Sequence, residues 1–279
     1  MAVITFYTNC KEETGNTTAA MALATYLGIE KNKKILFIST ALNDNTPREA
    51  FWPVQNKKIS GLFGPNTSII AENGIEGLDR VIRSNKISPD IITDYTKVAL
   101  TNRLEILLGY KGSEEQYAEI QKQYVQIINM ANKCYDTVIV DIDKDLDIKI
   151  KNEILNVSDI VLGMTTQKLE NINNLIKTIA QGVAIKKSNT ILVLGKYDEK
   201  SKYNAKNISR NVLKQRELVN TIPYNTRLFE SVQEGKIIDM ILDFRSLKTK
   251  DENSFFIEEI KRLVESINNK MVEIQQMMR

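Results

Sequence analysis

The chain has 279 residues, 42% of them hydrophobic and 26% charged, which is enough to bury the core of one large α/β domain or two small ones. Its net charge of +3, from 38 basic and 35 acidic residues, excludes an overall field that would require a nucleic acid or a membrane as partner. Two cysteines and no histidine exclude a disulfide framework, and their spacing indicates no metal site.

Short apolar runs alternate along the chain with segments of helical periodicity. The runs predict strands, in chain order, at Val3–Tyr7, Ile35–Ser39, Leu104–Leu108, Thr137–Asp141, Ser158–Thr165, Asn189–Lys196 and Leu218–Pro223. Helices are predicted between and after them at Thr17–Leu27, Ile75–Ile82, Glu114–Lys133, Asn171–Ala184, Asn204–Arg216 and about Phe255–Met278. This order predicts an α/β fold with a single doubly wound, mostly parallel sheet and helices on both of its faces.

We find no linker rich in proline, glycine or serine, so residues 1–279 are expected to form one domain, with a C-terminal amphipathic helix at about 255–279. The least regular stretch, Asn43–Asn73, is expected to be a long loop at the ligand-binding edge. The N-terminal MAVITFYTNC lacks the basic segment of a signal peptide, and no apolar run approaches the length of a membrane span. We therefore expect a cytoplasmic protein.

The segment Lys11–Thr18, KEETGNTT, lies where a phosphate-binding loop belongs, between the first strand and the first helix. In such a loop, glycines allow backbone N–H groups to face phosphate oxygens, and the following helix adds its positive N-terminal end. Gly15, Thr17 and Thr18 have the residue types that this geometry requires. They are the candidate cofactor-binding residues, together with Asn16.

Three other residues of the segment do not suit an anion. Asn16 stands where a phosphate-binding lysine is needed, and Glu12 and Glu13 add two negative charges. Like charges a few ångströms apart cost on the order of 1 kcal/mol near a protein surface. An alternative interpretation is a plain helix cap, with Asn16 or Thr17 as the N-cap residue.

The ordered series of motifs resembles the ParA/MinD family of deviant Walker-motif ATPases, including its MinD-like TadZ/CpaE branch. The family loop K-G-G-x-G-K-[ST]-T matches Lys11–Thr18, in which Lys11 corresponds to the lysine that reaches the partner's nucleotide in a dimer. The family pattern YDxIIxD is intact as Tyr135–Asp141, and TIPYNTRLFESVQEGK at Thr221–Lys236 is similar to the family's IPYD segment. SDIVLGMTTQKLENINN resembles a further family strand and loop, and the resemblance covers about the first 240 residues.

Other nucleotide-handling features of the family are altered. The second strand ends in Ile38–Ala41, without the family's two acids, and Gly195 stands where an asparagine often reads adenine. The resemblance therefore implies a P-loop NTPase-like fold with a degenerate site. Lys11 and Asp141 would be vestigial catalytic residues. Thr17 and Asp141 would hold a metal only if Mg-nucleotide binds, and no ATP or Mg is expected unless the degenerate site still binds them. Asp141 is equally interpretable as a capping or folding residue.

We therefore expect a pseudo-ATPase that acts as a positioning or assembly scaffold for a cellular machine, such as a secretion or pilus apparatus. The alternative is an active ParA-like partition ATPase that binds DNA nonspecifically. A third reading, a module for another anionic ligand at the helix end, is disfavoured by the two glutamates. The resemblance implies a homodimer, protein partners from the larger machine, and a cytoplasmic protein that can be peripheral to the membrane.

Two surface features leave partner alternatives open. The last helix could pack on the sheet, form a coiled-coil contact or lie on a membrane surface; its apolar seam consists of Ile257, Ile260, Val264, Ile267, Met271, Ile274 and Met278. A basic cluster could bind DNA or be a solvated helix face; it consists of Lys196, Lys200, Lys202, Lys206, Arg210, Lys214 and Arg216.

Overall fold

The computed structural model describes residues 1–53, 74–84, 88–182, 185–214, 219–247 and 251–277. Eight strands form one sheet in the order β3-β4-β2-β5-β1-β6-β7-β8. All neighbouring strands are parallel except the antiparallel pair β3 and β4 at one edge. The strands are β1 Ala2–Thr8, β2 Ile35–Ser39, β3 Lys97–Leu100, β4 Leu104–Leu107, β5 Thr137–Asp141, β6 Ile160–Thr165, β7 Thr190–Tyr197 and β8 Asn220–Pro223.

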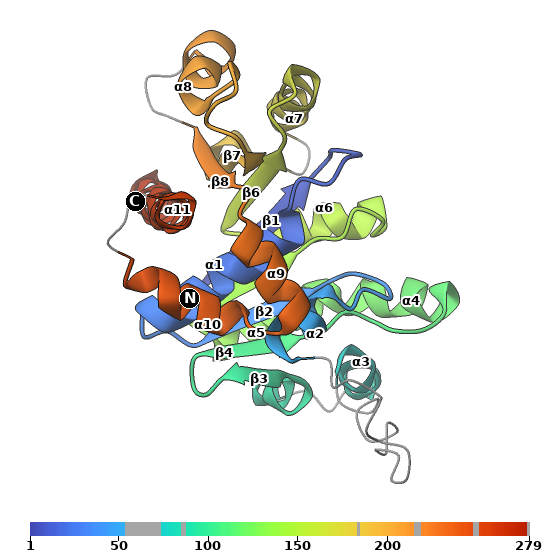
Figure 1. The fold of residues 1–279 in the computed structure, drawn as a ribbon. Coiled ribbons are helices and arrows are strands. Elements are labelled where there is room, and N and C mark those ends of the chain that lie inside the picture. Colours follow the sequence, from blue (N-terminus) through green and yellow to red (C-terminus); the bar gives the residue numbers. More distant parts are fainter. Residues whose placement is uncertain (54–73, 85–87, 183–184, 215–218, 248–250, 278–279) are drawn as a thin grey trace.

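Helices cover both faces of the sheet, so the predicted α/β fold class is confirmed (Figure 1). One face carries α1 Asn16–Glu30, α2 Thr46–Phe51, α9 Thr226–Glu234, α10 Ile237–Arg245 and α11 Glu252–Met277. The other face carries α3 Ile75–Arg83, α4 Glu114–Ile120, α5 Tyr124–Cys134 and α6 Ile148–Val157. The helices α7 Leu169–Gln181 and α8 Ala205–Ile208 pack beside β7 in a smaller apolar cluster.

The central strand β5 explains why the site lies where it does. Its five residues are all buried, because the strand has neighbours on both sides and helices over both faces. Its last residue, Asp141, is in register with Phe6 of β1 and Ser39 of β2. The acid is therefore fixed at the carboxyl edge of the sheet, where the loops after β1 and β2 begin.

The helix α1 follows β1 directly and has a continuous run of buried residues from Ala19 to Gly28. Its alanines let the helix pack closely on the sheet, and its first turn lies beside the end of β5, as the contact between Asn16 and Asp141 shows. The loop of residues 11–15 is thus held against the sheet edge by a helix with ten consecutive buried residues, Ala19 to Gly28.

Several predicted elements need correction. The single helix expected at Glu114–Lys133 is two helices, α4 and α5, joined by a 3₁₀ turn at Gln121–Gln123. The helix expected at Asn204–Arg216 is short: α8 ends at Ile208, one π-helical turn follows at Ser209–Leu213, and residues 215 and 216 lie outside the described part. Within the expected long loop Asn43–Asn73, residues 46–51 form α2, and residues 54–73 lie outside the described part.

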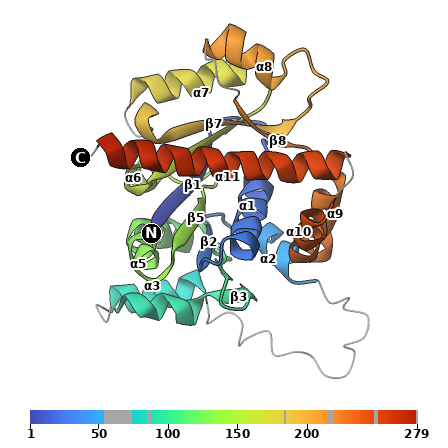
Figure 2. The ribbon, with the colours of Figure 1, turned by 90° about the vertical axis from the view of Figure 1, so that its left-hand side faces the viewer.

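The last helix, α11, packs on the sheet of this same chain (Figure 2). Its seam is buried from Phe256 to Ile267, against α10 and β8 among other elements. Beyond Ile267, Met271 and Ile274 still pack partly on the core, while Val272 is exposed. The described chain thus covers most of the seam itself, which favours the first of the three interpretations. Among the described residues, no helix combines the length and apolar character needed to cross a membrane.

Candidate functional site

A cavity of about 660 Å³ opens at the carboxyl edge of the sheet. Its polar end is formed by the loop after β1, by the segments that follow β2 and β5, and by Lys196 at the end of β7. Its other wall comes from the end of β8 and from α9. The lining residues are Thr8, Cys10–Thr18, Asp44, Thr46, Ile142–Lys144, Lys196, Ile222–Asn225, Leu228, Phe229, Val232 and Gln233.

The loop retains the backbone turn of a phosphate cradle. Gly15 is the N-cap of α1 with φ of 76°, a left-handed conformation that favours glycine. No side chain caps the helix, so the alternative with Asn16 or Thr17 as N-cap is wrong. The Thr18 hydroxyl instead donates to the Gly15 carbonyl at 3.0 Å. The first N–H groups of α1 therefore lack a side-chain acceptor at the cavity.

Asn16, the first residue of α1, contacts the end of β5. Its amide nitrogen donates to Oδ1 of Asp141 at 2.7 Å, and its own Oδ1 is buried without a partner. An amide is neutral, so it cannot balance the charge of an outer phosphate. The contact joins the two predicted site residues directly.

Asp141 is 3% exposed, and this burial raises its pKa from 3.8 to about 7. Hydrogen bonds from the side chains of Thr17 and Asn16 lower the pKa in part, whereas the charges of Asp143 and Asp44 raise it. The carboxyl is therefore partly protonated near neutral pH. Thr17 and Asp141, the two predicted metal ligands, do lie together, but among the described residues no group of three acidic or cysteine side chains could hold a metal ion.

The two loop glutamates are paired with lysines from neighbouring elements, Lys168 before α7 and Lys196 in β7. Glu12 forms an ion pair with Lys168 and accepts a hydrogen bond from Asn171 at 2.7 Å. Glu13 forms an ion pair with Lys196 at 3.0 Å. Hydrogen bonds from these lysines lower the pKa of both carboxyls, which keeps them ionised. The glutamates therefore hold in ion pairs two lysines that could otherwise bind a phosphate. The sequence did not reveal this effect.

The end of β7 is packed directly on the loop. A Cβ atom at Gly195 would lie 2.1 Å from the Thr14 carbonyl oxygen, so no larger residue fits there without movement. Lys196 follows with φ of 47°, and its Cγ lies 3.5 Å from where a Cβ on Gly15 would be. The close approach therefore explains why position 195 is a glycine. Lys11, by contrast, is exposed at the mouth of the loop.

The end of β2 is buried and tied to β5. Thr40 donates from its hydroxyl to the Asp141 carbonyl at 3.1 Å and accepts from the Asp143 N–H at 2.8 Å. Tyr117 donates to the Thr40 carbonyl, and Ala41 is 5% exposed. Residues 38–41, where the sequence comparison expects two acids, are thus buried and carry no acidic side chain. Asp44, three residues further on, lines the cavity and was missed because it follows the motif window.

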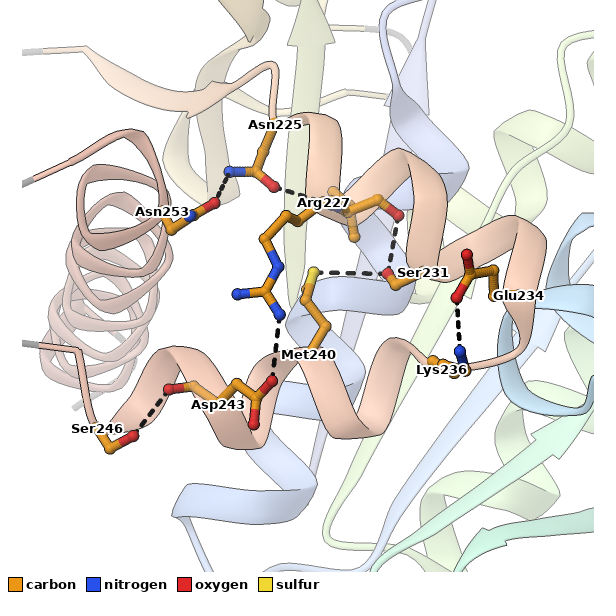
Figure 3. A network of polar contacts seen from close by, with 10 residues as sticks. Asn225, Arg227, Ser231, Glu234, Lys236, Met240, Asp243, Ser246 and Asn253 are labelled. Atoms are coloured by element: carbon orange, nitrogen blue, oxygen red, sulfur yellow. Dashed lines mark hydrogen bonds and ion pairs between the residues drawn. The ribbon is translucent and has the colours of Figure 1, made fainter.

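In the wall opposite the loop, α9 lines the cavity and forms a helical hairpin with α10 (Figure 3). Asn225 caps α9 by accepting from the Leu228 N–H at 2.8 Å, and its amide donates to Asn253 of α11 at 2.9 Å. Arg227 forms an ion pair with Asp243 at 3.2 Å, which joins the two helices of the hairpin. The wall is thus anchored to the last helix by a side chain that also lines the cavity. An Asn three residues before Leu228 is a recognisable cap signal that could have revealed α9.

Comparison with solved structures shows that the fold is that of ParA- and MinD-type ATPases. MinD from Pyrococcus horikoshii, the septum site-determining protein complexed with Mg-ADP, matches with a TM-score of 0.65 and 14% identity over 97% of this chain and 98% of its own. A ParA family ATPase from Chlorobium tepidum matches with a TM-score of 0.63 and 15% identity over 86% of this chain and 98% of its own. A proposed plasmid partition protein from Borrelia burgdorferi, bound to AMPPNP, matches with a TM-score of 0.61 and 18% identity over 96% of this chain and 99% of its own. No protein-family model matches the chain, and no curated protein matches it in sequence.

Proposed function

We propose that the chain is a ParA/MinD-like pseudo-ATPase that positions or assembles components of a cellular machine, such as a secretion or pilus apparatus, without turning over ATP. The carrying observation is the contact between Asn16 and Asp141. It places a neutral amide where a triphosphate requires a cation, against a carboxyl that is partly protonated. The neighbours with this fold include a septum site-determining protein and a proposed plasmid partition protein, both of which support a positioning role.

The residues present do not fit a Mg-triphosphate. The cradle keeps a left-handed Gly15 and an uncapped helix end, but it offers no lysine from α1. Lys196 is held by Glu13, and Lys168 by Glu12. Lys196 and Lys168 would have to leave their glutamates to reach a phosphate, and the two carboxylates would stay close to it. Both features oppose binding, so we assign structural roles to Gly15, Thr17 and Asp141 and no catalytic role to Lys11.

We further propose that the chain forms a homodimer through protein contacts alone and binds protein components of its machine. In this account the protein is cytoplasmic and can be peripheral to the membrane. A test measures both oligomeric state and phosphate release, with and without Mg-ATP. Sedimentation should give the same mass in both conditions, and phosphate release should stay at background. The matched positive control is the triple variant Glu12→Gly, Glu13→Gly, Asn16→Lys, which restores the residue types of the loop.

Steady phosphate release, or a dimer that forms only with Mg-ATP, would reject the proposal and favour the second candidate. That candidate is an active partition ATPase that binds DNA nonspecifically. It is favoured by one observation: six cations of the basic cluster are exposed, namely Lys196, Lys200, Lys202, Lys206, Arg210 and Lys214. ATP-stimulated DNA binding that weakens steeply with salt would establish it, whereas binding that ignores ATP would not.

A further inference from the structure

The segment around α8, next to β7 near one end of the sheet, carries a row of cations. Residues 200–214 contain five basic residues and no acidic residue. Four of the five follow one another at intervals of four positions, and we call them the basic row: Lys202, Lys206, Arg210 and Lys214. The row begins in the turn before α8 and ends at the residue that follows the π-helical turn Ser209–Leu213, so it runs the length of this helical segment (Figure 1).

The local geometry brings the basic row to one side of the segment. Residues four apart in a helix lie on the same face, about 6 Å apart along its axis. Lys206 lies on α8 and Arg210 in the π-helical turn. The Lys214 N–H donates to the Ser209 carbonyl, which places Lys214 one turn beyond Ser209 and Arg210. All four residues of the row are exposed, so the row is open to a partner.

The charges of the basic row have no counterpart in the described part of the chain. None of its residues forms an ion pair there, and the one side-chain contact is that of Lys202, whose ammonium lies 5.1 Å from the ring centroid of Tyr203. Like charges four positions apart destabilise a helix. Other helices pair a cation with an acid three or four positions away, as α3 and α11 do. The row is thus unfavourable in the isolated chain and becomes favourable when carboxylates lie against it.

The surroundings of the row favour an acidic protein segment over an extended polyanion. Asp198 and Glu199 directly precede residues 200–214 and are exposed, so a nucleic acid or an anionic membrane that continues past the row would meet their negative charge. Tyr203, Val212 and Leu213 are only partly buried beside the row. Apolar side chains of a protein helix can pack on them, whereas phosphate groups offer no apolar contact. A short amphipathic helix therefore suits this surface best.

We propose that the basic row binds an acidic helix of a partner protein, one that carries carboxylates four positions apart and apolar residues beside them. Carboxylates with this spacing are also about 6 Å apart along their helix, so they match the cations of the row. The guanidinium of Arg210 has the geometry to bind one carboxylate through two parallel hydrogen bonds. The inference rests on the proposed function, because it names the surface through which the scaffold holds a protein component.

The test is a fluorescence anisotropy titration of a labelled peptide with the full chain. The probe is a synthetic peptide of about 18 residues, long enough to be helical in water, with glutamates at successive i, i+4 positions and leucines beside them. Its control peptide has glutamine in place of every glutamate. At about 50 mM salt we expect a dissociation constant on the order of 100 µM for the acidic peptide and at least about tenfold weaker binding of the control. Binding of the acidic peptide should weaken severalfold at about 200 mM salt, because exposed ion pairs are screened.

Charge variants locate the contact on the row. The double variant Lys206→Gln, Arg210→Gln removes two of the four charges and should weaken binding of the acidic peptide about fivefold. The charge reversal Lys206→Glu, Arg210→Glu should weaken it at least about tenfold. The matched control is Lys133→Gln, Lys149→Gln, which removes two exposed cations from α5 and α6 on the other face of the sheet and should leave binding unchanged. Thermal unfolding verifies that each variant is folded.

The outcomes separate this inference from the proposed function. If the acidic peptide does not bind and phosphate release stays at background, the inference fails and the pseudo-ATPase stands. If the peptide binds through the row and the chain also releases phosphate steadily from Mg-ATP, the pseudo-ATPase fails and the acidic partner stands.

Three further results overturn the inference. The first is equal binding of the glutamate and glutamine peptides, and the second is binding that is insensitive to the charge reversal. The third is tighter binding, at the same salt concentration, of a DNA duplex or of vesicles that contain anionic lipid, which would assign the row to that polyanion instead of a protein partner.

Discussion

Replacement of Asp141 by asparagine should stabilise the protein, and more so at high pH than at low pH. Burial raises the pKa of Asp141 from 3.8, its value in an unfolded chain, to about 7. Between these two values the folded state binds more protons than the unfolded state, so the carboxyl costs stability progressively as the pH rises. Each tenfold change in proton affinity corresponds to about 1.4 kcal/mol, which gives a cost of at most about 4 kcal/mol above pH 7.

Asparagine removes this cost and keeps the Oδ1 that accepts from Asn16. Urea unfolding of wild type and Asp141→Asn at pH 8 should therefore differ by up to about 4 kcal/mol, and at pH 5 by only about 2 kcal/mol. The surface variant Asp239→Asn is the control and should show no such pH-dependent gain. A variant that is less stable than wild type at both pH values would refute the reasoning, because it would show that the fold depends on an ionised Asp141.

Two further predictions concern packing and capping around the cavity. Gly195→Ala places a Cβ 2.1 Å from the Thr14 carbonyl oxygen and should lower the free energy of unfolding by about 1–3 kcal/mol in thermal melts. The control Gly28→Ala in α1 adds a Cβ with only ordinary contacts from 3.4 Å, so it should be neutral or stabilising. Equal effects of the two variants would contradict the close approach of β7 to the loop. Asn225→Ala removes both the α9 cap and the bond to α11 and should cost about 1–3 kcal/mol, more than Asn253→Ala, which removes only the second contact. Urea unfolding of the two variants checks this order, and a larger loss for Asn253→Ala would contradict it.

The fold could be predicted because its signals are local. The buried run of β5 and the alternation of apolar runs with helical periods predicted seven of the eight described strands and most of the helices, but not the antiparallel edge strand β3. The break between α4 and α5 could not be seen, because buried Tyr117, Ile120 and Tyr124 keep a helical spacing across the 3₁₀ turn. The short capped helices were missed, although Asp147 caps α6 in the manner of an ordinary N-cap residue.

The site was predicted only in part, because its chemistry depends on contacts between residues far apart in sequence. The loop and Asp141 were identified from motifs, and the structure brings Asn16 and Asp141 together. Glu13 and Lys196, which form an ion pair, are 183 positions apart in the sequence, and no local pattern in either segment predicts the contact. For the same reason the sequence showed the glutamates only as repulsive charges, whereas in the fold each one holds a lysine.

The most direct test of the central claim is a calorimetric titration of the wild-type chain with Mg-ATP. Without a lysine on α1, and with Asn16 bonded to Asp141, the loop should give no saturable heat at ATP concentrations up to about 1 mM, which corresponds to binding weaker than about −4 kcal/mol. The variant Glu12→Gly, Glu13→Gly, Asn16→Lys should bind under the same conditions. A micromolar dissociation constant for the wild type, with the triphosphate ordered against Gly15 and Thr17, would contradict the account.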